Sequence, residues 1–152
     1  MTARFRILSL VLIAAIVLGV VGPASAQTGT GTGTVTCDGD GVVVLSGDFT
    51  ALSASIGAGA LVHNKPTKGN VTAKAGTTFV KYFSGDLVLY VGTGSGSASN
   101  VKGLKFTLSG ADGHIEVTGT GKMAVRGEGS CTTGSGKTIT WKSGEQSITV
   151  GP

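Results

Sequence analysis

Short runs of alternating apolar and polar residues recur along most of the chain. In one run, Leu104, Phe106 and Leu108 alternate with a lysine and a threonine, which is the two-residue period of a strand with one buried face. Residues 49–56 are ambiguous, because their alanines and serines also suit a helix. The clearest half-buried strands are expected at 42–45, 71–75, 78–83, 87–91, 104–108, 114–117, 122–126, 139–142 and 148–150.

Glycines separate these runs at a nearly regular step of seven to nine residues. The step can be followed through Gly94, Gly103, Gly110, Gly119, Gly127, Gly136, Gly144 and Gly151. Short strands at such spacing are typical of a β-sandwich, a β-barrel or a β-solenoid. No helix of convincing length and capping follows residue 26. The sequence therefore predicts an all-β, glycine-rich fold: an antiparallel β-sandwich or barrel of short strands, with a β-solenoid as the alternative.

The first 26 residues differ from the rest and read as a helical signal peptide. Arg4 and Arg6 precede an apolar run over residues 7–21, and residues 24–26 form an Ala-Ser-Ala cleavage pattern. The apolar run is short for a membrane-spanning helix, which needs about 20 residues. We expect a secreted or cell-surface protein that begins at Gln27. If the segment stays uncleaved, it would be the chain's attachment to a membrane.

Two further segments follow the predicted signal peptide. In residues 28–36 threonine alternates with glycine as far as Gly33, so the segment suits either a flexible tether or an extended strand. We therefore expect a glycine- and threonine-rich arm over residues 27–34. Residues 35–152 are expected to form a single all-β domain.

Composition narrows the range of partners. Removing Arg4 and Arg6 with the signal peptide leaves 10 basic against 8 acidic residues, a formal charge of +2 rather than +4. A group of four lysines makes one stretch mildly basic, but arginine and aromatic residues do not alternate with it: Lys65, Lys68, Lys74 and Lys81. This pattern indicates a solvated face, and we expect no nucleic-acid partner.

The two cysteines, Cys37 and Cys131, predict a disulfide, because an exported chain meets an oxidising compartment. Such a bridge would close a loop of nearly the whole domain and contribute roughly 4 kcal/mol in the chain-entropy model. In a simple solenoid the two cysteines would lie several coils apart. A sandwich or barrel can bring the first and last strands together, so the disulfide favours these two folds.

No residue pattern indicates catalysis. His63 and His114 lie outside any nucleophile signature, and their positions beside a turn and on a polar strand face indicate exposed side chains. Asp38 and Asp40 flank a glycine and are the candidates for a metal site, although such pairs also occur in ordinary tight turns. We expect a protein that is not an enzyme and that holds no cofactor.

The remaining hypotheses concern binding. The leading one is a non-enzymatic structural or interaction domain that is associated with the cell surface or self-assembles through strand edges, with itself or another surface protein or polymer as partner. The alternative is an extracellular ligand-binding module for carbohydrate or another surface polymer. The candidate rings for that module are Tyr82, Tyr90 and Trp141, because an aromatic face packs well against a sugar.

Overall fold

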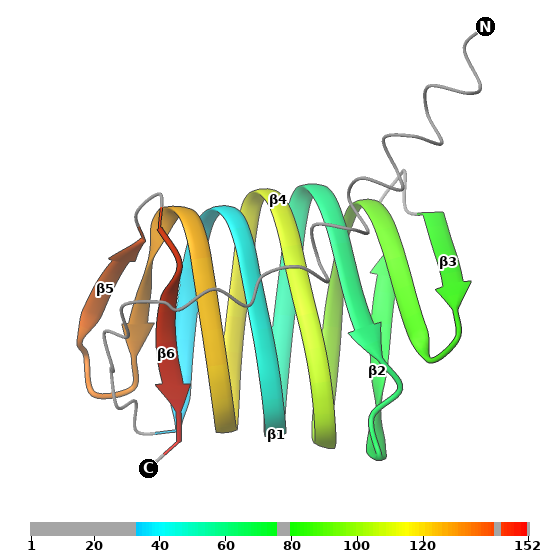
Figure 1. The fold of residues 1–152 in the computed structure, drawn as a ribbon, viewed down its shortest axis with the longest axis horizontal. Coiled ribbons are helices and arrows are strands. Elements are labelled where there is room, and N and C mark those ends of the chain that lie inside the picture. Colours follow the sequence, from blue (N-terminus) through cyan, green and yellow to red (C-terminus); the bar gives the residue numbers. More distant parts are fainter. Residues whose placement is uncertain (1–32, 76–79, 142–143, 152) are drawn as a thin grey trace, which may run out of the picture.

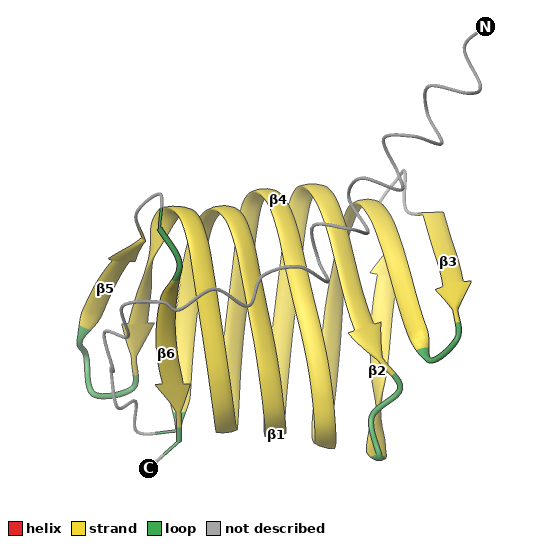
Figure 2. Cartoon of the chain, viewed as in Figure 1, coloured by secondary structure: helices red, strands yellow, loops and turns green. Residues whose placement is uncertain are grey.

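The computed structural model describes residues 33–75, 80–141 and 144–151, and nearly all of them lie in β-strands (Figure 2). The predicted signal peptide and residues 27–32 of the arm lie outside the described residues. The strands are β1 (Thr34–Asn64), β2 (Lys68–Ala75), β3 (Val80–Ser84), β4 (Leu87–Thr133), β5 (Thr138–Trp141) and β6 (Gln146–Val150). Every strand pairs antiparallel to β4, which confirms the predicted all-β, antiparallel fold. The described part of the chain contains no helix long and apolar enough to cross a membrane.

The architecture is a long β-hairpin wound into a coil (Figure 1). Strands β1, β2 and β3 make up the first half of the hairpin. A tight turn at Gly85 and Asp86 then reverses the chain, and β4 winds back along the whole length. A residue of β1 therefore lies between two residues of β4: Val43 pairs with Leu108 on one side and with Val125 on the other. These two partners are 17 positions apart, and this separation is one full turn of the coil.

Each turn of the coil crosses two sheet layers, so the coil is also a sandwich. Layer A contains β2, residues 95–99, 51–55, 114–118, 34–38 and 130–132, and β5, in that spatial order. Layer B contains β3, residues 87–91, 60–64, 104–109, 42–46 and 122–126, and β6. The short strands expected from the sequence are the straight segments of two long strands. The ambiguous residues 49–56 belong to β1.

Glycines form the corners between the two layers, and here neighbouring coils approach each other closely. Gly41 has φ +142° and pairs with Gly127 on the adjacent coil. A Cβ atom on Gly41 would lie against the carbonyl oxygen of Arg126 and 2.9 Å from the Cα of Gly127. Only glycine fits such a position without displacing backbone. The regular glycine step in the sequence is therefore half a turn of the coil.

The winding also reconciles the disulfide with the regular glycine step. Because β4 returns along the whole coil, the start of β1 and the end of β4 lie side by side at one end. Cys37 is directly opposite Cys131 in the strand register, and the two form a disulfide. In a coil made by a single strand the two cysteines would be separated. A coil made by two antiparallel strands contains both features.

The core lies between the two layers and runs along the axis of the coil. Its largest fully buried side chains alternate with outward-facing residues along β1, β4 and β6: Phe49, Phe106, Leu45, Leu61, Leu104, Ile115, Met123, Ile148, Val35, Val101, Val117 and Val125. Each is less than 2% exposed. Burial of this apolar surface stabilises the fold. In the described part of the chain no helix contributes to the core, so strand side chains alone provide this stabilisation.

Candidate functional site

The two ends of the sandwich differ in how well they are covered. At one end, named the capped end, β5 and β6 close the core (Figure 1). Their inward side chains Ile139, Trp141, Ile148 and Val150 are at most 4% exposed. At the other end, named the open end, the last strands are β2 and β3. Among the described residues, β2 and β3, like β5 and β6, each pair with β4 alone, so their outer edges have no strand partner.

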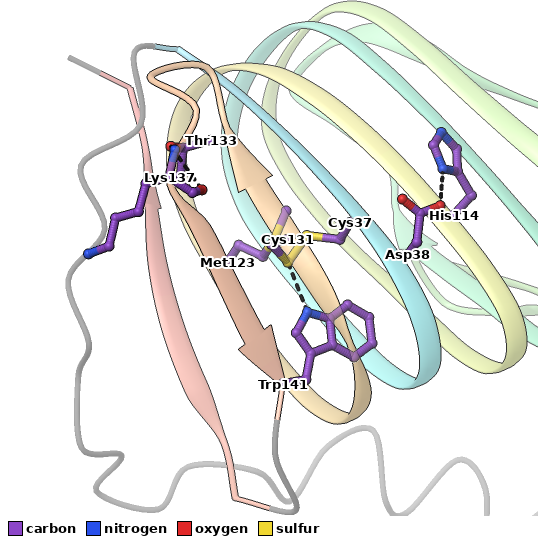
Figure 3. Close-up of a disulfide and its surroundings, with 8 residues drawn as sticks. All are labelled: Cys37, Asp38, His114, Met123, Cys131, Thr133, Lys137 and Trp141. Atoms are coloured by element: carbon purple, nitrogen blue, oxygen red, sulfur yellow. Dashed lines mark hydrogen bonds and ion pairs between the residues drawn. A yellow bond between two sulfur atoms is a disulfide. The ribbon is translucent and has the colours of Figure 1, made fainter.

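The disulfide belongs to the capped end, as Figure 3 shows. The indole Nε1 of Trp141 donates a hydrogen bond to Cys131 Sγ at 3.0 Å. Met123 Sδ lies 3.3 Å from Cys37 Sγ on the other side, as a sulfur–sulfur contact. Both cysteines are at most 1% exposed. The bridge therefore joins the last turn of the coil to its neighbour inside a dry, well-packed plug.

At the open end, two inward-facing rows of layer B finish on exposed side chains. One row passes through Ile148, Met123, Leu45, Phe106, His63 and Val88 and ends at Phe83. Ile148 is 1% exposed at the capped end of this row, whereas Phe83 is 70% exposed at the open end. The neighbouring row ends at Lys81, which is opposite Tyr90. The row from Ile148 to Phe83 therefore begins in a closed core and ends in solvent.

Lys81 lies on the inner side of its strand although it is charged. Its Nζ lies 4.7 Å from the ring centroid of Phe83 and 5.3 Å from that of Tyr90. Such contacts of an ammonium group over aromatic rings are favourable but weak at an exposed site, about 0.5–1 kcal/mol. In the described residues, no carboxylate forms an ion pair with this lysine.

The three large hydrophobic side chains that are exposed in the described residues all lie on β3 or at the start of β4, on either side of the turn at Gly85 and Asp86. They are Tyr82 at 42%, Phe83 at 70% and Leu87 at 36% exposure. Val71 and Ala73 on β2 pack only partly against the core at the same end. An apolar group of this kind beside an unpaired strand edge is a typical feature of an interaction site.

The candidate rings do not come together in one place. Tyr82 is on the surface, whereas Tyr90 is 7% and Trp141 is 4% exposed. Trp141 is at the capped end and Tyr90 is near the open end, where its ring stacks on His63 with centroids 6.0 Å apart. A sugar can therefore reach only the ring of Tyr82 without a rearrangement of the core.

The prediction of an exposed His63 was wrong. The turn after it did not reveal that its ring faces the core, where it is 7% exposed. Its Nδ1 donates to the carbonyl oxygen of Asn64 at 2.8 Å, while its Nε2 is buried and has no hydrogen-bond partner among the described residues. Burial, above all, lowers the pKa of His63 below its usual 6.5; the hydrogen bond to Asn64 opposes this shift and the charge of Lys81 adds to it.

The two aspartates proposed for a metal site turn to different partners. Asp38 Oδ1 accepts from His114 Nδ1 at 2.6 Å, and Asp40 Oδ1 accepts from the backbone N–H of Asp112 at 2.8 Å. In the part of the chain that the structure describes, no group of three or more histidine, cysteine or acidic residues is placed to hold a metal ion.

The contact between His114 and Asp38 calls for comparison with a catalytic triad. Ser55 is the cross-strand neighbour of His114 on the side away from Asp38. However, no hydrogen bond joins Ser55 to His114 among the described residues, and the two paired side chains are 42% and 67% exposed on the outside of layer A. A serine nucleophile needs to donate a hydrogen bond to its base and to lie in a site that excludes water. This group provides neither.

Comparisons with known proteins do not assign the chain to a family. No family model matches the sequence, and no curated protein matches it. A non-cellulosomal cohesin from the hyperthermophilic archaeon Archaeoglobus fulgidus is a similar solved structure, with 12% identity over 83% of this chain and 86% of that one. The TM-score of 0.19 means that the two backbones do not superpose as one fold, so the role of the cohesin does not transfer.

Proposed function

We propose that this protein is an exported, non-enzymatic interaction domain that binds its partner through the open end of the sandwich. The observation that carries the proposal is the difference between the two ends of one core row, from Ile148 at 1% exposure to Phe83 at 70%. An edge strand with unpaired backbone groups and apolar side chains can accept a further strand, which is β-augmentation. Export is supported by the predicted signal peptide and by the disulfide.

The open end carries a feature that opposes pairing with a second copy. Lys81 is on edge strand β3 and faces inward, and an inward-facing lysine is a common means of preventing edge-to-edge association. The edge of β3 is otherwise suited to pairing, because its register with β4 is regular and the exposed residues Tyr82, Phe83 and Leu87 are apolar. We therefore expect the wild-type domain to be a monomer that becomes self-associating once this lysine is removed.

A substitution that removes the lysine tests whether the open end accepts a strand. The domain from Gln27 onward should be monomeric by sedimentation velocity and light scattering, and Lys81→Val should form a dimer as its concentration rises. Lys137→Val is the matched control, since Lys137 is an exposed lysine in the turn before β5 at the capped end. A Lys81→Val protein that is folded and still monomeric at millimolar concentration would refute the proposal.

The alternative function, a carbohydrate-binding module, depends on a single ring. Tyr82 is the one candidate of the three that is exposed. A single ring offers less stacking surface than a platform of several aromatic residues. A titration with glycans that leaves the environment of Tyr82 unchanged would rule out this alternative.

A further inference from the structure

We infer that the open end binds an extended segment of a different protein in which an acidic and an apolar side chain stand two positions apart, on the same face of the strand. This inference rests on the proposed function and specifies its partner. It follows from three features: the position of Lys81, the register of the rows that end on β3, and the charge of the surrounding strands.

Lys81 requires an anion once the open end is covered. At present Lys81 is an exposed residue, and its Nζ lies over the rings of Phe83 and Tyr90. A strand added to the outer edge of β3 would close the space between the layers and remove that solvent. A buried ammonium group is costly unless it is paired, so the added strand must provide a carboxylate. A second copy paired antiparallel through β3 would instead bring a second Lys81 into the same space.

The register of β3 defines where each side chain of the added strand would lie. Lys81 and Phe83 face inward and are two residues apart, whereas Tyr82 between them faces outward. Since side chains alternate along a strand, the partner needs an acidic side chain beside Lys81 and an apolar one two positions away beside Phe83. Its intervening side chain packs next to Tyr82. The partner segment therefore has an acidic residue and an apolar residue separated by any one residue. The direction of the partner strand decides which of the two comes first.

The charge around the site favours the same partner. Residues 65–87 contain four lysines and one acidic residue, Asp86. Lys65 lies next to the hairpin turn, where its backbone N–H donates to the carbonyl oxygen of Asp86 at 2.9 Å, and Lys68 and Lys74 are on β2. Such a basic end attracts an acidic segment and raises the rate of association at low salt.

The experiment uses three capped octapeptides that differ in one residue type. Threonine stands at every other position, and the positions between alternate valine with glutamate in the first peptide, with glutamine in the second and with lysine in the third. Affinity for the domain from Gln27 onward is measured by calorimetry, and hydrogen exchange of β3 and β6 amides locates the site. We expect the glutamate peptide to bind at least about tenfold more tightly than the glutamine peptide. We also expect exchange to slow in β3 and not in β6.

A charge reversal makes the test specific to Lys81. In Lys81→Glu the order of the peptides should invert, so that the lysine peptide binds most tightly. The matched control Lys137→Glu should keep the wild-type order. Because the partner side chain must lie beside Lys81, a peptide preference that is the same in wild type and Lys81→Glu overturns the inference.

The outcomes separate the inference from the proposed function. If all three peptides bind alike and protect β3, the open end accepts strands but does not select acidic ones. If none binds while Lys81→Val dimerises, the inference is again overturned and the proposed function stands. If none binds and Lys81→Val stays monomeric, both are overturned. A wild-type protein that itself dimerises through β3 supports the proposed function and overturns the acidic partner.

Discussion

Reduction of the disulfide gives the most quantitative test of the wound hairpin. Cys37 and Cys131 are separated by 94 positions, so the bridge restricts most of the unfolded domain. In the chain-entropy model a loop of this length is worth about 4.7 kcal/mol at 25 °C. Both cysteines are fully buried and directly opposite each other in the strand register, so the reduced thiols can occupy the same space. We therefore expect reduction to destabilise the domain by roughly 4–5 kcal/mol with little change in fold.

The assay is urea unfolding of oxidised and reduced protein, followed by circular dichroism. With an m-value of about 1.5 kcal/mol/M, the midpoint should fall by roughly 3 M on reduction, and Tm should fall by roughly 20 °C. The m-value should increase, because the unfolded chain expands once the bridge is open. The variant Cys37→Ala/Cys131→Ala, which cannot respond to reductant, is the control. A loss below about 1 kcal/mol would refute the reasoning, since it would mean that the bridge does not constrain the unfolded chain.

Three further predictions concern other parts of the molecule. Gly41→Ala should lower the free energy of unfolding by more than about 2 kcal/mol, because its Cβ would meet the carbonyl oxygen of Arg126, whereas Gly144→Ala, with nothing within 4 Å, should change it by less than about 0.5 kcal/mol in the same urea titration. The lowered pKa of His63 means that the unfolded chain binds a proton at higher pH than the folded chain; Tm should therefore fall as the pH drops below about 6.5, and His63→Phe should reduce this dependence. Trp141→Ala should destabilise the capped end by about 3–5 kcal/mol, and an effect below 1 kcal/mol in urea unfolding would contradict its role as a plug.

Much of the local structure could be predicted because it depends on local chemistry. The alternation at 104–108 and at 122–126 correctly indicates which side chains face the core, since a strand with one wet face needs that period. The glycine step correctly indicates the places where the chain turns. The step does not reveal that Gly41 and Gly127 face each other across adjacent coils, because that proximity depends on pairing between residues far apart in the sequence.

The overall path of the chain was harder to predict, for the same reason. A regular step of half a turn has the same appearance in a single-stranded solenoid and in a wound hairpin. The pairing of Cys37 with Cys131 distinguishes the two once it is combined with the turn at Gly85, where the chain reverses. Taken separately, the glycine step supported a solenoid, and the cysteine pair supported a sandwich or barrel. Taken together, they define a coil in which the start of β1 and the end of β4 lie side by side.

The candidate site was only partly visible in the sequence. Tyr82 was selected as an aromatic residue, and it is exposed as that hypothesis requires. Lys81 and Phe83 were not selected, although their spacing places them on one face of a strand. The difficulty is physical: Val80 and Tyr82 make the opposite face at least as apolar as the face with Lys81 and Phe83, so alternation does not indicate that the lysine faces inward. Only the register with β4 places Lys81 beside Tyr90 on the inner side.

The difference between the two ends of the coil is a consequence of its winding. A coil of this type has two terminal turns, and each leaves one strand edge in each layer without a partner. At the capped end, β5 and β6 cover the core with Trp141 and Ile148, and the disulfide fastens the turn beneath them. At the open end the corresponding strands are β2 and β3, which leave Phe83 exposed, and an inward-facing lysine occupies the place that Gln146 has at the capped end. Because a lysine in that row opposes self-pairing yet attracts an acidic strand, the open end is better suited to a different protein than to a second copy.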